Sequence, residues 1–162
     1  SVTIPDSVTN IGNSAFAYCS GLTSITVERG NTKYYSEGNC LIETESKTLV
    51  LGCKTSVIPD SVTNIGNSAF AGCEWSKSLI IPDGVTSIGG AAFMHCTRLT
   101  SITIPASVTN IGNSAFIYCI KLTRIAFNGT IAQWNAISKG DYWKKYMPSE
   151  CKVICTDGTV SI

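Results

Sequence analysis

The residues best suited to chemistry in this chain are eight cysteines and a single histidine. Cys19, Cys73, Cys96 and Cys119 each follow a phenylalanine by three residues. Thiolates form disulfides, bind zinc and act as nucleophiles. These four thiols, however, recur at one position of a repeating pattern, which predicts an inward-facing column. In a core, free cysteine behaves as a small apolar side chain, so we expect buried, reduced thiols.

The other cysteines form two pairs along the chain. Cys40 and Cys53 flank a predicted hairpin and are the best candidates for a disulfide. Cys151 and Cys155 lie four residues apart on an expected strand, where packing is commoner than bonding. The sequence leaves the redox state of both pairs open. Because there is no Cys-x-x-Cys knuckle, we expect no metal site and no cofactor.

His95 stands beside Cys96, and a cysteine next to a histidine suggests an activated nucleophile. The other repeats carry Tyr18, Gly72 and Tyr118 at the histidine position. A position that accepts such different residues is expected to lie on the outside of the fold. The sequence therefore favours a structural role for His95 over a catalytic one.

The carboxylates are scattered, and the glycines form no phosphate-binding loop. No two acidic residues are placed as a general acid and base, so we expect no enzymatic activity in this chain. Asp6, Asp60 and Asp83 are expected in turns, and Glu43 and Glu45 on a hairpin tip.

Composition excludes further classes of protein. Charged residues make up 14% of the 162 residues, the net charge is +1 and the pI is about 7.5. This balance argues against a nucleic-acid partner, because such proteins carry a strongly basic face. No apolar run approaches the roughly 20 residues that span a bilayer, so the chain is not expected to be inserted in a membrane.

An internal repeat governs the expected fold. Residues 4–16 recur unchanged as residues 58–70, in altered form as 81–93 and nearly intact as 104–116. The last three copies start at residues 58, 81 and 104, a spacing of 23 residues. Three of the four copies are followed by a Leu-x-x-Ile-x-hydrophobic step, which predicts a short strand with its apolar side chains inward. A period in the twenties predicts a solenoid.

The remaining positions of the repeat suggest its local structure. Proline ends the strand because it has no N–H to donate. Val-x-x-Ile-Gly predicts a second extended piece, and Asn-Ser-Ala-Phe-x-x-Cys predicts a short helical turn. The glycines are expected at bends with positive φ; they are Gly12, Gly66, Gly89 and Gly112. In the second copy Ser76 replaces the leucine, and Trp75 is expected to fill its space.

The chain divides into a solenoid, residues 1–127, and a C-terminal cap, residues 128–162. Within the solenoid, residues 27–57 interrupt the period. Residues 40–42 and 48–51 flank a polar tip, which predicts a hairpin-bearing variant repeat.

In the cap, Thr130 and Gln133 fit a capping box that opens a short helix. Residues 151–155 and 159–162 are expected to form a terminal strand and tail.

The pattern Ile-Pro-x-x-Val-x-x-Ile-Gly-x-x-Ala-Phe-x-x-Cys-x-x-Leu-x-x-Ile resembles the BspA-like class of leucine-rich repeats over nearly the whole chain. The resemblance implies a mainly β solenoid with a parallel sheet on its concave face. The family is typical of bacterial and protist surfaces and is associated with adhesion. It thus implies a secreted or cell-surface protein that binds a host or microbial surface or extracellular-matrix protein or glycan, and it supplies no catalytic residues.

On this scaffold the outward side chains of the parallel strands form the candidate binding surface. Ile80 is apolar where other repeats carry Thr, which suggests a contact anchor, and Arg124 offers a bidentate donor. The predicted ligand-binding residues are Ser24, Thr26, Ser78, Ile80, Ser101, Thr103 and Arg124.

Other interpretations stay open at this point. Trp134, Tyr142, Trp143 and Tyr146, close to two lysines, offer a rival surface on the cap. The chain also fits an accessory module of a larger extracellular enzyme, or a structural spacer. The uncapped N-terminal edge would allow end-to-end self-association, because an open layer exposes strand edges.

Overall fold

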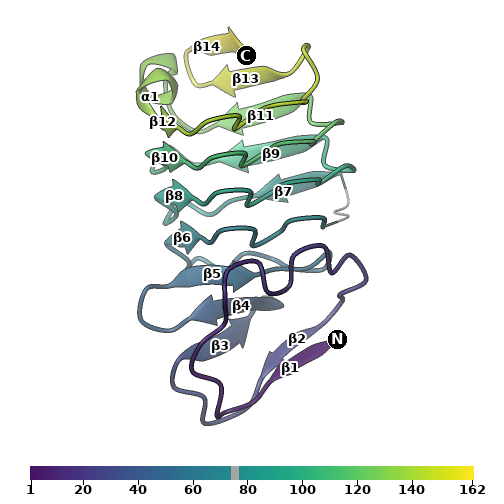
Figure 1. Ribbon diagram of the computed structural model, residues 1–162. Helices are drawn as coiled ribbons and strands as arrows, with labels where there is room; N and C mark the ends of the chain where they lie inside the picture. The colour runs from purple at the N-terminus through teal and green to yellow at the C-terminus, as the bar shows by residue number, and fades with distance from the viewer. Residues whose placement is uncertain (74–76) are drawn as a thin grey trace.

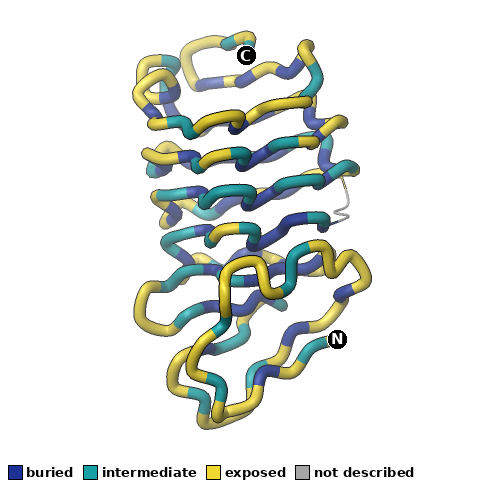
Figure 2. Tube along the Cα trace, in the orientation of Figure 1, coloured by how far each residue is buried: buried dark blue, intermediate teal, exposed yellow. Residues whose placement is uncertain are grey.

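Beyond the first repeat, the chain forms a stack of coils, each lying directly on the next (Figure 1). A computed structural model describes residues 1–73 and 77–162. The roles predicted for Trp75 and Ser76 lie outside the described residues. Buried and exposed residues alternate along each coil, so apolar side chains line the interior of the stack (Figure 2).

The strand steps from residue 78 onward form one parallel ladder, as the alternation of apolar residues predicts. Neighbouring strands pair in register one repeat apart, and an antiparallel strand closes the ladder at its C-terminal end. The strands of this five-stranded sheet are β7 (Ser78–Ile80), β9 (Ser101–Ile104), β11 (Arg124–Phe127), β13 (Lys152–Cys155) and β14 (Gly158–Ser161).

The Val-x-x-Ile-Gly segments form a second ladder of two-residue strands along another edge of the coils. The parallel strands are β6 (Asn64–Ile65), β8 (Ser87–Ile88), β10 (Asn110–Ile111) and β12 (Ser138–Lys139). An antiparallel meander extends this sheet through β5 (Thr48–Leu51), β4 (Cys40–Glu43) and β3 (Tyr34–Glu37).

The meander contains the hairpin expected within residues 27–57, and it adds one strand, β3, that the sequence did not reveal. Gly38 and Asn39 connect β3 to β4 with φ of 56° and 60°. Two positive φ angles define a type I′ turn, whose twist matches that of the paired strands.

The Asn-Ser-Ala-Phe-x-x-Cys segments form consecutive turns instead of a continuous helix. The amide of Ala71 donates to the carbonyl of Ser68, three residues earlier, at 3.0 Å. Ser68 has a φ of 55°, which interrupts any helical run. The amide of Phe70 donates to the carbonyl of Ala92 in the next coil at 2.8 Å. These segments therefore make a third ladder between coils.

Gly66, Gly89 and Gly112 are needed for close packing and not for positive φ, contrary to the sequence-based expectation for these three glycines and Gly12. None of the four has a positive φ. A Cβ on Gly89 would lie 2.7 Å from the amide nitrogen of Asn67 in the preceding coil. The left-handed residues instead follow two positions later, and they are Ser14, Ser68, Ala91 and Ser114.

Stacked phenylalanines run through the centre of the core. The Phe70 and Phe93 rings lie 5.4 Å apart and nearly parallel, and Phe93 and Phe116 lie 5.1 Å apart. Trp143 of the cap meets Phe116 edge-on at 6.3 Å and ends the stack. The cap thus shares one continuous core with the stacked coils, whereas the buried residues of the first repeat belong to a second cluster.

The cap keeps the coil path after the sequence motif has disappeared. Thr130 caps helix α1 (Ile131–Ala136), and its capping box with Gln133 is formed. Beyond the helix, β12 pairs with β10 and β13 pairs with β11. The C-terminal segment therefore adds another coil on top of the last recognisable repeat.

The first repeat departs from the stack. Strands β1 (Val2–Ile4) and β2 (Ile25–Val27) pair only with each other, in a separate parallel sheet beside β3 and β4. Phe16 is consequently half-buried, whereas Phe70, in the identical sequence of the second copy, is fully buried.

Close stacking predicts unequal effects of one substitution at two equivalent positions. Gly89→Ala should lower the free energy of unfolding by about 1–3 kcal/mol, the usual cost of overpacking, because its Cβ would meet the preceding coil. Gly12→Ala is the matched control, since nothing lies within 4 Å of a Cβ there. Urea denaturation measures both, and equal losses would contradict the packing role.

Candidate binding surface

Five of the seven predicted ligand-binding residues lie together on the outer face of the five-stranded sheet. Strand register places them in two rows that run across the strands. One row holds Ser78, Ser101, Arg124 and Lys152, and the other holds Ile80, Thr103, Ala126 and Ile154. We call these eight residues the β9 face.

Ser24 and Thr26 do not belong to this face, contrary to the sequence-based expectation. They lie at and just before β2, which pairs with β1 and not with β7. The variant repeat separates the first repeat from the later ones, so equivalent positions in the sequence do not lie on one surface.

The β9 face is rigid and carries an exposed apolar residue. Strand β9 is hydrogen-bonded on both sides, by β7 and β11, which fixes the positions of its outward side chains. The Ile80 side chain is 70% exposed. Lys152 and Ile154 were missed in the sequence because the repeat motif ends before them. Only the pairing of β13 with β11 shows that Lys152 and Ile154 extend the two rows.

A basic hollow adjoins the start of these strands. It has a volume of about 400 Å³ and is lined by Lys77, Ser78, Arg98, Thr100 and Lys121. Arg98 and Lys121 are 23 residues apart and occupy the same position in successive repeats. That shared position is the one sign of the hollow in the sequence. The proximity of Lys77 to both residues is seen only in the structure.

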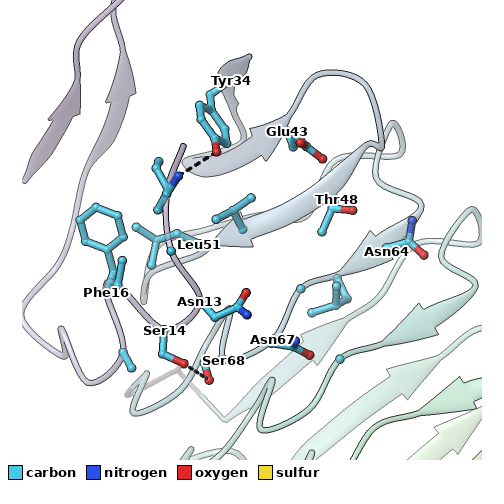
Figure 3. A pocket seen from close by; sticks show the side chains of 18 of the residues that line it. Asn13, Ser14, Phe16, Tyr34, Glu43, Thr48, Leu51, Asn64, Asn67 and Ser68 are labelled. Carbon is cyan, nitrogen blue, oxygen red and sulfur yellow. Dashed lines mark hydrogen bonds between the residues drawn. The ribbon is translucent and has the colours of Figure 1, made fainter. Parts of the chain in front are cut away.

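A second cavity, of about 410 Å³, separates the first repeat from the meander and the second repeat (Figure 3). Its lining includes Asn13, Phe16, Glu43 and Asn67. At one side of the cavity the first repeat touches the second, where Ser14 Oγ donates to Ser68 Oγ at 2.9 Å and the amide of Tyr18 donates to the carbonyl of Ala71 at 3.0 Å. The cavity is therefore a consequence of the displaced first repeat.

The buried cysteines satisfy the backbone of the coil beneath them. Cys96 Sγ donates to the carbonyl of Phe70 at 3.3 Å, and Cys119 Sγ donates to that of Phe93 at 3.1 Å. Burial raises the pKa of the Cys73 thiol to about 12. The Cys73 thiol therefore stays protonated at neutral pH and is a poor nucleophile.

Two other features of the cysteines differ from or extend the sequence-based picture. Cys19, expected in the buried column, is exposed because the first repeat is displaced. All eight cysteines are unbonded, including the candidate pair Cys40 and Cys53. Burial also raises the pKa of Cys40 to about 12.

His95 belongs to a stack of rings on the outer corner of the coils. Its ring lies 4.4 Å from that of Tyr118 and 5.7 Å from that of Tyr18, and Tyr118 lies 4.5 Å from Tyr146. The Cys96 sulfur points inward to the Phe70 carbonyl. The His95 ring and the Cys96 thiol therefore point in opposite directions, one outward and one into the core, and do not form a catalytic pair.

The cap aromatics divide between core and surface. Trp134 and Trp143 are buried, 2% and 9% exposed, and they seal the last layer. Tyr142 and Tyr146 are exposed, and Lys145 Nζ lies 4.8 Å and 5.0 Å from their ring centroids. Lys145 therefore occupies one face of each ring, and both tyrosines remain exposed.

Within residues 1–73 and 77–162, no three His, Cys, Asp or Glu side chains converge in a way that could hold a metal ion. Over the same residues, no helix is both long and apolar enough to cross a bilayer.

Comparison with known proteins identifies the fold family. The BspA type leucine rich repeat region matches residues 1–50 and 49–156 in six copies. The chain therefore belongs to this family of leucine-rich repeat solenoids, whose fold is typically non-catalytic. No curated protein matches the chain.

Solved structures agree with this assignment. A leucine-rich repeat protein from Eubacterium ventriosum is 26% identical with a TM-score of 0.74, over 94% of this chain and 41% of that one. The pneumococcal vaccine antigen PcpA is 18% identical with a TM-score of 0.57, over 93% of this chain and 46% of that one, and supports the fold alone. The chain thus spans less than half the length of either structure.

The burial pattern predicts selective thiol chemistry. In the native protein at pH 8, an aromatic disulfide reagent should modify Cys19 rapidly and the other seven cysteines at least ten-fold more slowly, because they are buried. Urea should release all eight at similar rates. Cys19→Ser should abolish the rapid phase, and a remaining rapid thiol would contradict the buried column.

Proposed function

We propose that this chain is a non-catalytic binding module of a secreted or cell-surface bacterial protein. The module attaches that protein to a host or microbial macromolecule. The β9 face makes the contact. The carrying observation is the exposure of Ile80 on a sheet face that is fixed in register over four strands.

A rigid surface suits recognition, because little conformational entropy is lost when a partner binds. The inner side chains of β9, Ile102 and Ile104, are buried in the shared core and hold the strand in place. Ser78 and Ser101 contribute hydroxyls that make no hydrogen bond within the described part of the chain. Exposed apolar anchors with neighbouring hydroxyls fit the surface of a protein or glycan partner.

Membership of a family associated with adhesion supports an extracellular location. The thiols are compatible with this location although disulfides usually form outside the cell. Seven of the eight cysteines are buried, which shields them from oxidants, and burial raises the pKa of Cys40 and of Cys73 to about 12, which suppresses their reactive thiolate form.

The β9 face makes a testable prediction. Ile80→Glu with Thr103→Glu should weaken saturable binding to matrix proteins or host cells at least ten-fold, since loss of a central apolar contact costs about 2 kcal/mol. Binding to a panel of immobilised matrix proteins and cells measures the effect.

Thr86→Glu with Thr109→Glu is the matched control. Both threonines are exposed, one coil apart, beside the short-stranded sheet. The two glutamate substitutions introduce the same charge away from the β9 face and should leave binding unchanged. Equal loss in both variants would contradict the assigned face, and no binding by the native chain would favour a spacer or accessory module.

A further inference from the structure

Basic side chains gather beside the β9 face. Three line the hollow of about 400 Å³, and Arg124 and Lys152 continue from it in register on β11 and β13. All five are exposed. We call the group Lys77, Arg98, Lys121, Arg124 and Lys152 the basic strip.

This concentration contrasts with the near-neutral chain. Residues 77–162 contain eight Lys and Arg against four Asp and Glu, while the whole chain carries +1. The strip lies at the N-terminal ends of the strands. Asp83 and Asp157 instead follow the C-terminal ends of β7 and β13. Glu150, two residues before Lys152, is the acidic residue nearest to it in this part of the sequence. Glu74 lies outside the described residues.

Four of the five side chains of the strip are available to an external anion. Within the described part of the chain, Lys77, Lys121, Arg124 and Lys152 make no side-chain ion pair. Four like charges without partners repel one another, so an anionic ligand would relieve this repulsion.

We propose that the basic strip binds a linear anionic polysaccharide bearing sulfate or carboxylate groups. This inference deepens the proposed binding function and rests on it. It assigns the chemical class of one ligand and a contact area that overlaps the β9 face at Arg124 and Lys152.

The spacing of the charges favours a polymer over a single small anion. The strip places at least one cation on each coil that contributes β7, β9, β11 and β13. Three steps between neighbouring strands span about 14 Å. A chain lying across the strands would meet a cation at every step, and arginine forms bidentate hydrogen bonds with carboxylate and similar oxyanions.

The lining favours a sugar polymer over other polyanions. Ser78 and Thr100 supply hydroxyls beside the cations. None of the described residues that line the hollow is aromatic, whereas single-stranded nucleic acids bind on aromatic stacking platforms. Peptides that add to a sheet use an unpaired strand edge, and the strip instead crosses successive paired strands.

Titration calorimetry of the 162-residue chain tests the proposal. The probes are a heparin-derived oligosaccharide, an oligogalacturonate, a neutral dextran oligosaccharide and a thymidine oligonucleotide. We expect saturable binding of at least one anionic oligosaccharide, weakened by salt because bound counterions are released, and no binding of dextran. The sulfated and carboxylated probes distinguish the two sources of charge.

Paired variants identify the site. Arg98→Glu with Lys121→Glu should weaken oligosaccharide binding more than ten-fold. Arg29→Glu with Lys33→Glu makes the same charge change in the exposed loop between β2 and β3 and should alter affinity less than two-fold. Thermal melting checks that both variants fold.

Three outcomes would overturn the proposal. These are absence of binding to both anionic oligosaccharides, equal losses in the two variants, and equal affinity for the oligonucleotide, which would indicate general attraction to polyanions. The Ile80→Glu, Thr103→Glu pair separates this inference from the proposed function. If matrix binding remains sensitive to that pair while no oligosaccharide binds, the strip proposal fails and the β9 face stands.

Discussion

The structure depends on one constraint: the backbone of each coil must lie in contact with the backbone of the next. Three ladders of hydrogen bonds enforce this contact, through the two sheets and the turns between them. The contact leaves no room for a side chain at Gly89 or Gly112, where a Cβ would approach backbone atoms within 2.7 Å. Phenylalanines stack and thiols donate to carbonyls because equivalent residues are held one coil apart.

The same constraint separates scaffold from function. Inward residues must repeat, since each coil presents the same space to its neighbours. Outward residues do not have to repeat. The positions that indicate function are therefore the surface positions where the residue differs from its equivalents in other repeats. Ile80 replaces a hydroxyl residue, and Arg98 and Lys121 introduce charge at one shared position. Register then converts these local departures into continuous rows and a strip.

Much of the fold follows from the sequence, and the exceptions have physical causes. The strands at 101–104 and 124–127, the hairpin of residues 40–51 and the Thr130 capping box are local patterns, so they were predictable. The role of the glycines was not, because a close approach between coils is a tertiary property.

The candidate site was predicted only in part, for the same reason. Ser78, Ile80, Ser101, Thr103 and Arg124 share a face because their repeats are consecutive. Ser24 and Thr26 match them in sequence, but the intervening meander separates their sheet. Lys152 was missed because its coil keeps the backbone path without the motif.

The identity of residues 4–16 and 58–70 has a consequence for how such a chain changes over generations. Unequal exchange between the two gene segments would delete or duplicate a block of 54 residues, the spacing between the copies. The exchange would join the two segments within the same thirteen-residue sequence. The alternation of inward and outward side chains would therefore be preserved across the joint. The module can therefore gain or lose whole coils, and the positions of its surface groups, in single inherited events.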